Sequence, residues 1–315
     1  FGLLKVKEPA ALSRFRQRLS WGDLDKDAIR KLIRLAAEED LHGKGLKNEA
    51  AQTGDQTTIS MGVSGQGTPA IVAREPLVAC GLPMIPLILE EFEVEDSTVE
   101  HSKSDGDEVE VGETLAFISG AAVGLLAAER TLLNFIQRLS GVATASKAFV
   151  KALSETKTDL LDTRKTTPGY RALEKYATAT GGFFNHRYGL NDRILVKDNH
   201  LAANRATKGK KLAESVARLK RTGPSLLVEV EVDCSEQIAP VLSAGVDAIL
   251  LDNFSIEEVA EAVEEIQGRA VVEASGGITL ESARQYADAS PHFLSTGAPV
   301  HNSSWMDLGL DWTNR

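Results

Sequence analysis

Basic side chains gather in one stretch of an otherwise acidic chain. Residues 164–197 hold seven arginines or lysines against Glu174 and Asp192, a local charge of +5, whereas the formal net charge of the 315-residue chain is −10. A positive pocket in an acidic protein concentrates small anions. Guanidinium groups bind carboxylate or phosphate oxygens through two parallel hydrogen bonds. The stretch therefore predicts an anion-binding site.

The seven cations are not expected to share one role. Arg171 and Lys175 fall in a predicted helix over 170–179, where we expect them on the solvated face in routine ion pairs. His186 adds a hydrogen-bond donor, and the segment 162–169 (DTRKTTPG) has no pattern typical of a buried core. The cations that flank predicted strand ends are the candidates for anion binding: Arg164, Lys165, Arg187 and Lys197.

Two carboxylates, Glu231 and Asp252, end successive predicted strands 21 residues apart. On neighbouring strands they would share one rim, and paired carboxylates that face phosphates are typical of a bridging Mg²⁺. The alternative is that they pair with Lys197 and neutralise the rim, and the sequence leaves both readings open. Glu229 lies in the same strand, but we prefer Glu231 because it is nearer to the strand's end.

A glycine pair follows a later predicted strand. Ser275-Gly276-Gly277 precedes a helix that begins near Leu280, so backbone N–H groups there could bind a phosphate. Barrels often bind phosphate in the loops after their late strands. Gly297 ends the next predicted strand, with His301 close behind, and could complete the phosphate site.

The elements that would position these residues repeat along the chain. Four apolar segments begin 22 residues apart, at 226–232, 248–252, 270–275 and 292–296, and earlier members are 159–162 and 193–197. A helix over 256–267 lies between two of them, with a capping box of Ser255 and Glu258 at its start and Gly268 at its end. This alternation predicts a parallel sheet built from βαβ units.

We expect the sheet to close as an α/β barrel. Nearly every predicted strand ends in polar or glycine residues. The carboxyl ends of all strands converge on one face of a barrel, where active sites lie. A doubly wound open sheet would use only the strand ends near its switch point.

The residues before about 115 have mixed patterns. We expect a helix over 23–39, a loop over 43–67, strands at 70–73 and 87–94, a hairpin over 105–116 and a buried helix over 115–128. The hairpin resembles those of lipoyl or biotinyl carrier domains. Because it carries no exposed lysine on a tight turn, we interpret it as structural.

Composition excludes several classes of protein. A net charge of −10 and 5% aromatic residues argue against a nucleic-acid or anionic-membrane partner. The chain begins without an apolar secretion signal, and its longest apolar run is too short to span a bilayer. Cys80 and Cys234 lie far apart in apolar stretches, so we expect two buried thiols and a reducing, cytoplasmic location.

Together these motifs resemble those of the quinolinate phosphoribosyltransferases. The matching strings cover roughly the last two-thirds of the chain, in the family's order: Glu129 to Asn134, Ser140 to Ala143, 162–169, Asn185-His186-Arg187, 195–200 (LVKDNH), 228–233 (VEVEVD), 250–254 (LLDNF), 274–279 (ASGGIT) and 295–298 (STGA). One departure is Phe183-Phe184, where the family more often has small residues, and this change would tighten the pocket wall.

The resemblance implies a fold of two parts, typical of type II phosphoribosyltransferases. One is an N-terminal α/β sandwich of residues 1–118, rejoined by the C-terminal tail 298–315. The other is an open α/β barrel of residues 119–297, with fewer than eight strands. The resemblance also implies a homodimer, or a larger assembly, in which Arg130 reaches into the neighbour's active site.

The activity that the resemblance implies is a step of de novo NAD biosynthesis. The phosphoribosyl group of phosphoribosyl pyrophosphate is transferred to quinolinate, with Mg²⁺ as cofactor, to give nicotinate mononucleotide, CO₂ and pyrophosphate. The residues expected to bind quinolinate are Arg130, Thr163, Arg164, Lys165, His186, Arg187 and Lys197. Those expected to bind the donor are Lys165, Glu231, Asp252, Ser275, Gly276, Gly277, Gly297 and His301. Lys197, Glu231 and Asp252 would be catalytic, and the two acids would hold Mg²⁺ through the donor or through water.

Three alternatives remain at this point. A nicotinate phosphoribosyltransferase would bind a substrate with one carboxylate and need fewer cations. A Schiff-base aldolase would use Lys197 as its nucleophile on a barrel strand. A carrier or scaffold protein would use the segment 105–116 and have no active site.

Overall fold

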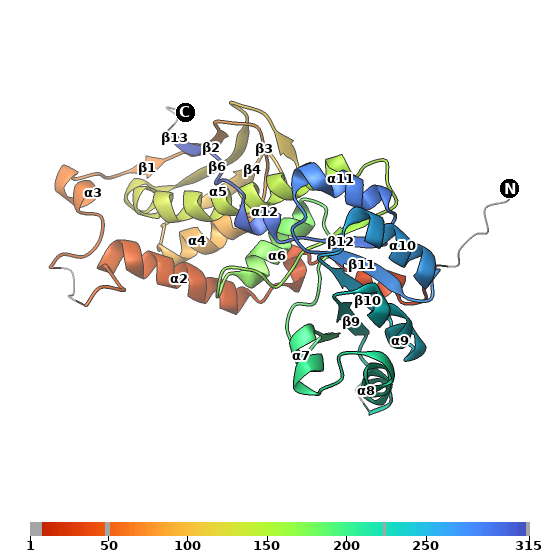
Figure 1. The fold of residues 1–315 in the computed structure, drawn as a ribbon. Helices are drawn as coiled ribbons and strands as arrows, with labels where there is room; N and C mark the ends of the chain where they lie inside the picture. Colours follow the sequence, from red (N-terminus) through yellow and green to blue (C-terminus); the bar gives the residue numbers. More distant parts are fainter. Residues whose placement is uncertain (1–7, 48–50, 223–224, 313–315) are drawn as a thin grey trace. The chain divides into compact units, whose positions relative to one another are not determined.

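The computed structural model describes residues 8–47, 51–222 and 225–312, which form two compact units. The first comprises the residues up to Arg18, Ala148–Thr166 and Gly182–His301. The second comprises Leu19–Lys147, Thr167–Gly181 and the residues from Asn302 onward. Figure 1 labels their helices and strands. Each unit therefore draws on several separate stretches of the chain.

A six-stranded parallel sheet forms the centre of the first unit, in the order β7-β12-β11-β10-β9-β8. From β8 to β12, strands that are consecutive in the chain are neighbours, and the first strand, β7, pairs with the last. This cyclic order is that of a barrel, because a doubly wound sheet reverses its strand order at a switch point. The order ends at β7 and β8, so the barrel is open, as predicted. The strands are β7 (Asp159–Leu161), β8 (Ile194–Val196), β9 (Val228–Val232), β10 (Ala248–Asp252), β11 (Val271–Ser275) and β12 (Phe293–Ser295).

Helices alternate with these strands, as Figure 1 shows from green to blue. In α10, Ser255 Oγ accepts from the Glu258 N–H (3.2 Å), and Glu258 Oε2 accepts from the Ser255 N–H (2.8 Å), so the predicted capping box is confirmed. Apolar side chains of the helices and of the outward-facing strand positions form one core. The helices are α7 (Asp198–Ala203), α8 (Gly209–Thr222), α9 (Ile238–Ser243), α10 (Ile256–Ile266), α11 (Leu280–Asp288) and α12 (Ala298–His301), with the 3-10 turn η3 (Ser235–Gln237) before α9.

Side chains of the opposite strand face fill the barrel in layers. The lowest layer is apolar: it combines α1 (Leu12–Phe15) with strand residues such as Val271 and Phe293, and the rings of Phe15 and Phe293 stack at 5.9 Å. Because side chains alternate along a strand, the next inward residue of β11 is Glu273, which is buried, and the one after it is Ser275, at the strand's end. The interior thus changes from apolar to charged toward the carboxyl ends of the strands.

The second unit is an antiparallel sheet covered by helices. Its strands run in the order β1-β6-β2-β13, with β4 also paired to β6, and β3 pairs with β5 separately. The pairing of β13 with β2 brings the end of the described chain back to this sheet. The strands are β1 (Gln66–Gly67), β2 (Pro69–Ala73), β3 (Leu77–Val78), β4 (Thr98–His101), β5 (Glu108–Val109), β6 (Thr114–Ala121) and β13 (Leu308–Trp312). The helical elements are η1 (Trp21–Asp23), α2 (Lys26–His42), α3 (Gln56–Met61), η2 (Leu82–Met84), α4 (Ile85–Glu91), the first part of α5 (Ala122–Ala152) and α6 (Arg171–Thr180).

Several expectations for this unit were wrong. The strand expected at 87–94 is instead α4, whose buried residues Ile85, Ile88 and Leu89 have helical spacing. The run over 115–128 is divided between β6 and α5. The hairpin over 105–116 does not form, because β5 pairs with β3 whereas β6 pairs with β1, β2 and β4. By contrast, the stretch over 43–67, expected to be largely loop, is so in its described residues, apart from α3 and β1.

Two side chains also differ from expectation. Lys175 is 1% exposed rather than solvated, because α6 is buried continuously from Leu173 to Ala179. Cys80 is buried as expected, but Cys234 is partly exposed, because it follows the end of β9 rather than lying inside the strand.

The compact units are interleaved, whereas the sequence predicted 1–118 with 298–315 for one part and 119–297 for the other. Residues 8–18 group with the barrel because Leu12 and Phe15 pack in its lowest layer. The start of α5 groups with the sandwich, where Ser140 Oγ accepts from the Cys80 N–H (3.1 Å). No helix in the described residues is both long enough and apolar enough to cross a membrane.

Candidate active site

A pocket of about 370 Å³ opens at the carboxyl ends of the barrel strands. All of its lining residues belong to the first unit. The pocket brings the predicted cations and the predicted acids to one place. Its lining residues are Thr163, Arg164, Lys165, His186, Arg187, Leu195, Lys197, Glu231, Leu250, Asp252, Glu273, Ser275 and Ser295.

Acids gather on the side of the pocket formed by β8, β9 and β10. Glu231 accepts a hydrogen bond from the ammonium group of Lys197. Burial nevertheless raises the pKa of Glu231, and the charges of Asp252 and Asp198 add to the rise. Burial, Asp198 and Asp252 likewise raise the pKa of Asp233. These carboxylates therefore repel one another, and their oxygens could serve as ligands of a hard cation.

The sequence reasoning missed two of these acids. Asp198 directly follows Lys197, and Asp233 directly follows the strand that carries Glu231. A search for acids within one or two residues of each predicted strand end would have found both.

Guanidinium groups lie on the side formed by the segments after β7 and before β8. Arg187 is 8% exposed, and its Nη1 donates to the carbonyl of Arg193 at 3.3 Å. Burial and the neighbouring charge of Arg164 lower the pKa of Arg187. The Nε of Arg164 is buried without a hydrogen-bond partner in the described chain. Two like charges held together, one with an unused donor, indicate a site for an anion.

Asp162, at the end of β7, holds the loop that carries His186 and Arg187. It is 2% exposed, and its carboxylate accepts from the backbone N–H of His186 and from the side-chain amide of Asn185, both at 2.7 Å. Phe184 N–H also donates to the carbonyl of Leu160 at 2.8 Å. Sequence reasoning assigned no role to Asp162, although this residue begins the segment 162–169.

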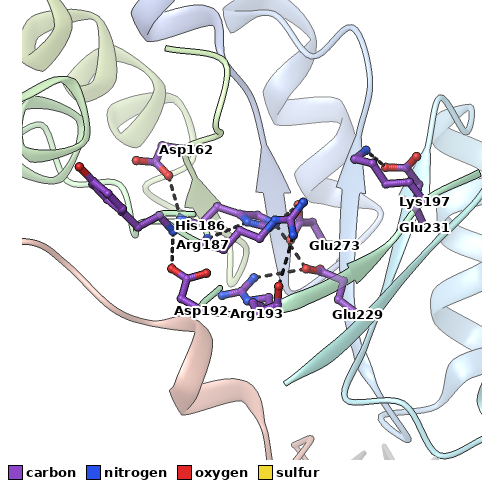
Figure 2. A network of polar contacts seen from close by, with 10 residues as sticks. Asp162, His186, Arg187, Asp192, Arg193, Lys197, Glu229, Glu231 and Glu273 are labelled. Atoms are coloured by element: carbon purple, nitrogen blue, oxygen red, sulfur yellow. Dashed lines mark hydrogen bonds and ion pairs between the residues drawn. The ribbon is translucent and has the colours of Figure 1, made fainter. Parts of the chain in front are cut away.

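Buried charges meet in one layer inside the barrel (Figure 2), and two members of this layer, His186 and Glu273, line the pocket. Nε2 of His186 is 3.4 Å from a carboxylate oxygen of Glu229 and 3.4 Å from one of Glu273. Arg193 forms an ion pair with Glu229 at 3.3 Å, and its guanidinium lies over the ring of Phe15 at 4.0 Å. Glu229 therefore belongs to this layer, one pleat below Glu231. Sequence reasoning missed Glu273, whose signal is a lone charge within the apolar segment 270–275.

His186 has a pKa far from its usual value. Although burial alone would lower it, the carboxylates of Glu273 and Glu229 raise the pKa of His186 to about 9. The reciprocal effect of His186 lowers the pKa of Glu229 despite its burial, whereas burial and the charge of Glu229 raise the pKa of Glu273.

The loops that follow β11 and β12 contain glycines at which a side chain would contact neighbouring residues. Gly276 has φ +99°, and a Cβ there would overlap the side-chain oxygen of Asn253. A Cβ on Gly297 would lie 3.0 Å from the ring of His301 and 3.3 Å from the hydroxyl of Thr163. Of the predicted phosphate-binding residues, Ser275 lines the pocket, whereas four are not among its lining residues: Gly276, Gly277, Gly297 and His301.

Three predicted features lie elsewhere. Nε2 of His301 is 3.1 Å from the carbonyl of Lys165, so this histidine contacts the loop after β7. Arg130 is exposed on α5 in the second unit, and its predicted role in a neighbour's site stays a prediction. Phe183 does not line the pocket: it is fully buried, with its ring edge-to-face on Phe149 at 6.0 Å.

Comparisons with known proteins agree over most of the chain. Residues 55–140 match the family model for the N-terminal domain of quinolinate phosphoribosyl transferase, and residues 142–311 match that for its C-terminal domain. Nicotinate-nucleotide pyrophosphorylase (carboxylating) of Mycobacterium leprae is 40% identical over 294 residues, which is 92% of this chain and 99% of that protein. A probable enzyme of the same name in Bacillus subtilis is 38% identical over 83% of this chain and 89% of its own length.

A solved structure gives the same result. The nicotinate-nucleotide pyrophosphorylase of Francisella tularensis has a TM-score of 0.82 and 32% identity, over 94% of this chain and 100% of that one. The chain therefore belongs to the quinolinate phosphoribosyltransferase family.

Proposed function

We propose that this chain transfers the phosphoribosyl group of phosphoribosyl pyrophosphate to quinolinate, with loss of CO₂, to give nicotinate mononucleotide and pyrophosphate. The observation that carries this proposal is the opposite charge on the two sides of one pocket. The guanidinium group of Arg187 is buried beside the like charge of Arg164, whose Nε has no hydrogen-bond partner in the described residues, so this side favours an anion. Burial and the like charges of Asp252 and Asp198 raise the pKa of Glu231 despite its contact with Lys197, so the opposite side favours a cation. A dicarboxylate and a metal-bound sugar pyrophosphate supply both.

The cationic side would bind quinolinate. Arg164 and Arg187 would each pair with carboxylate oxygens, and His186 would add positive charge at the floor. Thr163 and Lys165 line the same side, and Lys197 lies where the two sides meet. Guanidinium forks fix the orientation of a planar dicarboxylate as well as its position.

The acidic side would bind the donor together with Mg²⁺. Glu231 and Asp252 would hold the ion through oxygens of the donor or through water, since carboxylate oxygens are ligands that it prefers. Bound there, Mg²⁺ would neutralise charge on the departing pyrophosphate. The 5-phosphate would bind at the ends of β11 and β12, where the predicted ligands are Ser275, Gly276, Gly277, Gly297 and His301.

The reaction needs positioning rather than a protein nucleophile. The ring nitrogen of quinolinate forms a bond to the ribose carbon as the bond from that carbon to pyrophosphate breaks. The ribose gains positive charge in the transition state, which Glu231 and Asp252 stabilise. The alkylated nitrogen is then cationic and stabilises the electron pair left on the ring when the adjacent carboxylate leaves as CO₂. A proton replaces the lost carboxylate.

The test of this function is direct. Purified protein is given quinolinate, phosphoribosyl pyrophosphate and Mg²⁺, and nicotinate mononucleotide, pyrophosphate and CO₂ are measured in equal amounts. Replacing quinolinate with nicotinate tests the first alternative, and borohydride trapping with substrate tests a Schiff base on Lys197. The comparisons favour neither alternative. Product from nicotinate but not from quinolinate would contradict the proposal.

We also propose a cytoplasmic homodimer, or a larger homo-oligomer, with shared active sites. The support is the exposure of Arg130, an arginine in a motif of the family, outside the unit that forms the pocket. Arg130→Ala and Lys197→Ala should each be inactive, and mixing the two variants after subunit exchange should restore part of the activity. Failure to recover activity in proven mixed oligomers would refute the shared site.

A further inference from the structure

His186 and Glu273 belong to a layer of buried charges at the floor of the pocket, and the chemistry described above gives no role to Glu273. We propose that Glu273, with Glu229, keeps His186 as an imidazolium, so that the pocket keeps a positive group at His186 at neutral pH, and that Glu273 is thereby a positioning residue for the dianionic substrate. This inference rests on the proposed function. It assigns a task to a carboxylate that touches neither substrate.

The first support is the geometry of the layer. His186, Glu229 and Glu273 offer ligand atoms that all lie within 4.8 Å of one another, and all three residues are buried. Within the described chain, neither carboxylate oxygen of Glu273 accepts a hydrogen bond of good geometry. Burial and the charge of Glu229 raise the pKa of Glu273, so this carboxylate is ionised only beside a positive partner. The imidazole 3.4 Å away is that partner.

The groups around His186 favour a proton over a metal ion. Glu229 and Glu273 face the ring from β9 and β11, and Asp162 accepts from the backbone N–H of His186 from the end of β7. Arg193, before β8, already pairs with Glu229 and would repel a divalent ion. The remaining charges face the pocket above: Arg164, Lys165, Arg187, Lys197, Glu231 and Asp252.

One contact opposes protonation of the ring. The backbone N–H of Arg187 donates to Nδ1 of His186 at 2.8 Å, which stabilises the neutral form protonated at Nε2. This is one dipole, whereas Nε2 faces two carboxylates in a buried site. Charge-assisted contacts are roughly twice as strong as contacts between neutral groups. We therefore expect the two carboxylates to prevail, in line with the raised pKa of His186.

The pH dependence follows from the sign of this shift. A histidine whose pKa is raised to about 9 is cationic below that value and loses its charge as the pH rises through it. Quinolinate binding should thus be unchanged through neutral pH and weaken near pH 9. Replacing Glu273 by glutamine removes one carboxylate, so the charge on His186 should be lost at a lower pH.

The first experiment needs no substrate and no substitution at Glu273. The chain has six histidines, so selective ¹⁵N labelling resolves their rings, and the His186→Gln variant assigns the one at issue. At pH 7.5, both ring nitrogens of His186 in the wild-type protein should give the shifts of an imidazolium. A neutral ring at this pH would overturn the proposal.

The second experiment compares steady-state kinetics of Glu273→Gln with the wild type between pH 6 and 9.5. If His186 in the variant titrates near its ordinary pKa, about a tenth of the molecules still carry the charge at one pH unit above that pKa. KM for quinolinate at pH 7.5 should then rise about tenfold. The ratio of KM in the variant to KM in the wild type should be smaller at pH 6, and kcat should change less than KM. Glu273→Asp, which keeps the carboxylate, should restore part of the affinity.

The matched control is Glu264→Gln, which makes the same change on the exposed face of α10 and should leave the pH profile unchanged. If Glu273→Gln raises KM equally at every pH, Glu273 acts by packing alone and the proposal is wrong. A wild-type protein that shows the imidazolium but makes no nicotinate mononucleotide would overturn the proposed function and not the state of the ring.

Discussion

The buried Nε of Arg164 leads to a prediction in which one substitution weakens substrate binding without lowering the stability of the unliganded protein. Its buried Nε has no partner in the described residues, and a buried unsatisfied donor costs about 1–3 kcal/mol. A substrate carboxylate would remove that cost through a charge-assisted hydrogen bond, which contributes about 1.5–3 kcal/mol. Arg164→Ala should therefore weaken quinolinate binding by roughly 2–3 kcal/mol, or roughly 30- to 150-fold in KM. The same change removes an unsatisfied group, so the unliganded protein should unfold at an equal or higher temperature.

Initial rates at saturating donor give KM and kcat, and calorimetry of the unliganded protein gives the melting temperature. Arg164→Lys keeps the charge but loses the fork, so its KM should lie between those of the wild type and of Arg164→Ala. Arg218→Ala removes an exposed guanidinium from α8 and is the matched control. A KM for Arg164→Ala within about threefold of the wild type, a change below 1 kcal/mol, would refute the assignment. A clear fall in melting temperature would show that the donor is satisfied within the protein.

Three further substitutions test the barrel beneath the site by chemical denaturation. Arg193→Met leaves the buried carboxylate of Glu229 short of a partner 3.3 Å away and should destabilise the fold by about 3–5 kcal/mol; a loss below about 1 kcal/mol would mean that the pair is solvated. Gly276→Ala places a Cβ against Asn253 at a left-handed φ and should cost about 1–3 kcal/mol, and an unchanged midpoint would argue against that loop conformation. Phe15→Ala removes a fully buried ring from the lowest layer and should lower the free energy of unfolding by about 3–5 kcal/mol. A clearly smaller loss would show that residues 8–18 dissociate readily from the barrel.

The barrel could be predicted because its repeat is set by geometry. One strand, one helix and two short connections need a nearly constant length of chain, and segments starting 22 residues apart became β9, β10, β11 and β12. Polar strand ends then located the pocket, because parallel strands bring their carboxyl ends to one rim. The same reasoning failed for 87–94, where a short apolar run fits a strand or a buried helix equally well.

The charged interior could not be assigned from the sequence for a related reason. The alternation in β9 shows that Glu229 and Glu231 share a face, but not which one reaches the rim. That depends on register: Leu250 of β10 lies beside both Glu231 and Glu273, whereas Glu229 lies beside Ala248 one pleat lower. His186 comes from a loop. Its contacts with Glu229 of β9 and Glu273 of β11 depend on Asp162, which accepts a hydrogen bond from the His186 N–H and so fixes that loop. Contacts that depend on register and on loop geometry leave no periodic signal.

In the described residues, a hydrogen bond from Lys197 to Glu231 joins the cationic side of the pocket to the acidic side, so binding on one side should affect binding on the other. Lys197 donates to Glu231, so the cation nearest to the quinolinate side partly neutralises the acid nearest to the donor side. An anion bound beside Lys197 competes for its ammonium group and leaves Glu231 closer to full negative charge, next to Asp252 and Asp198. A donor bound with the proposed magnesium ion would relieve that repulsion and would thereby release Lys197 toward the anion. By reciprocity of binding free energies, each substrate should then increase the affinity for the other. Removing the ammonium group in Lys197→Ala should abolish this coupling even where each substrate still binds alone, because the remaining charges of each side are held on different strands and loops.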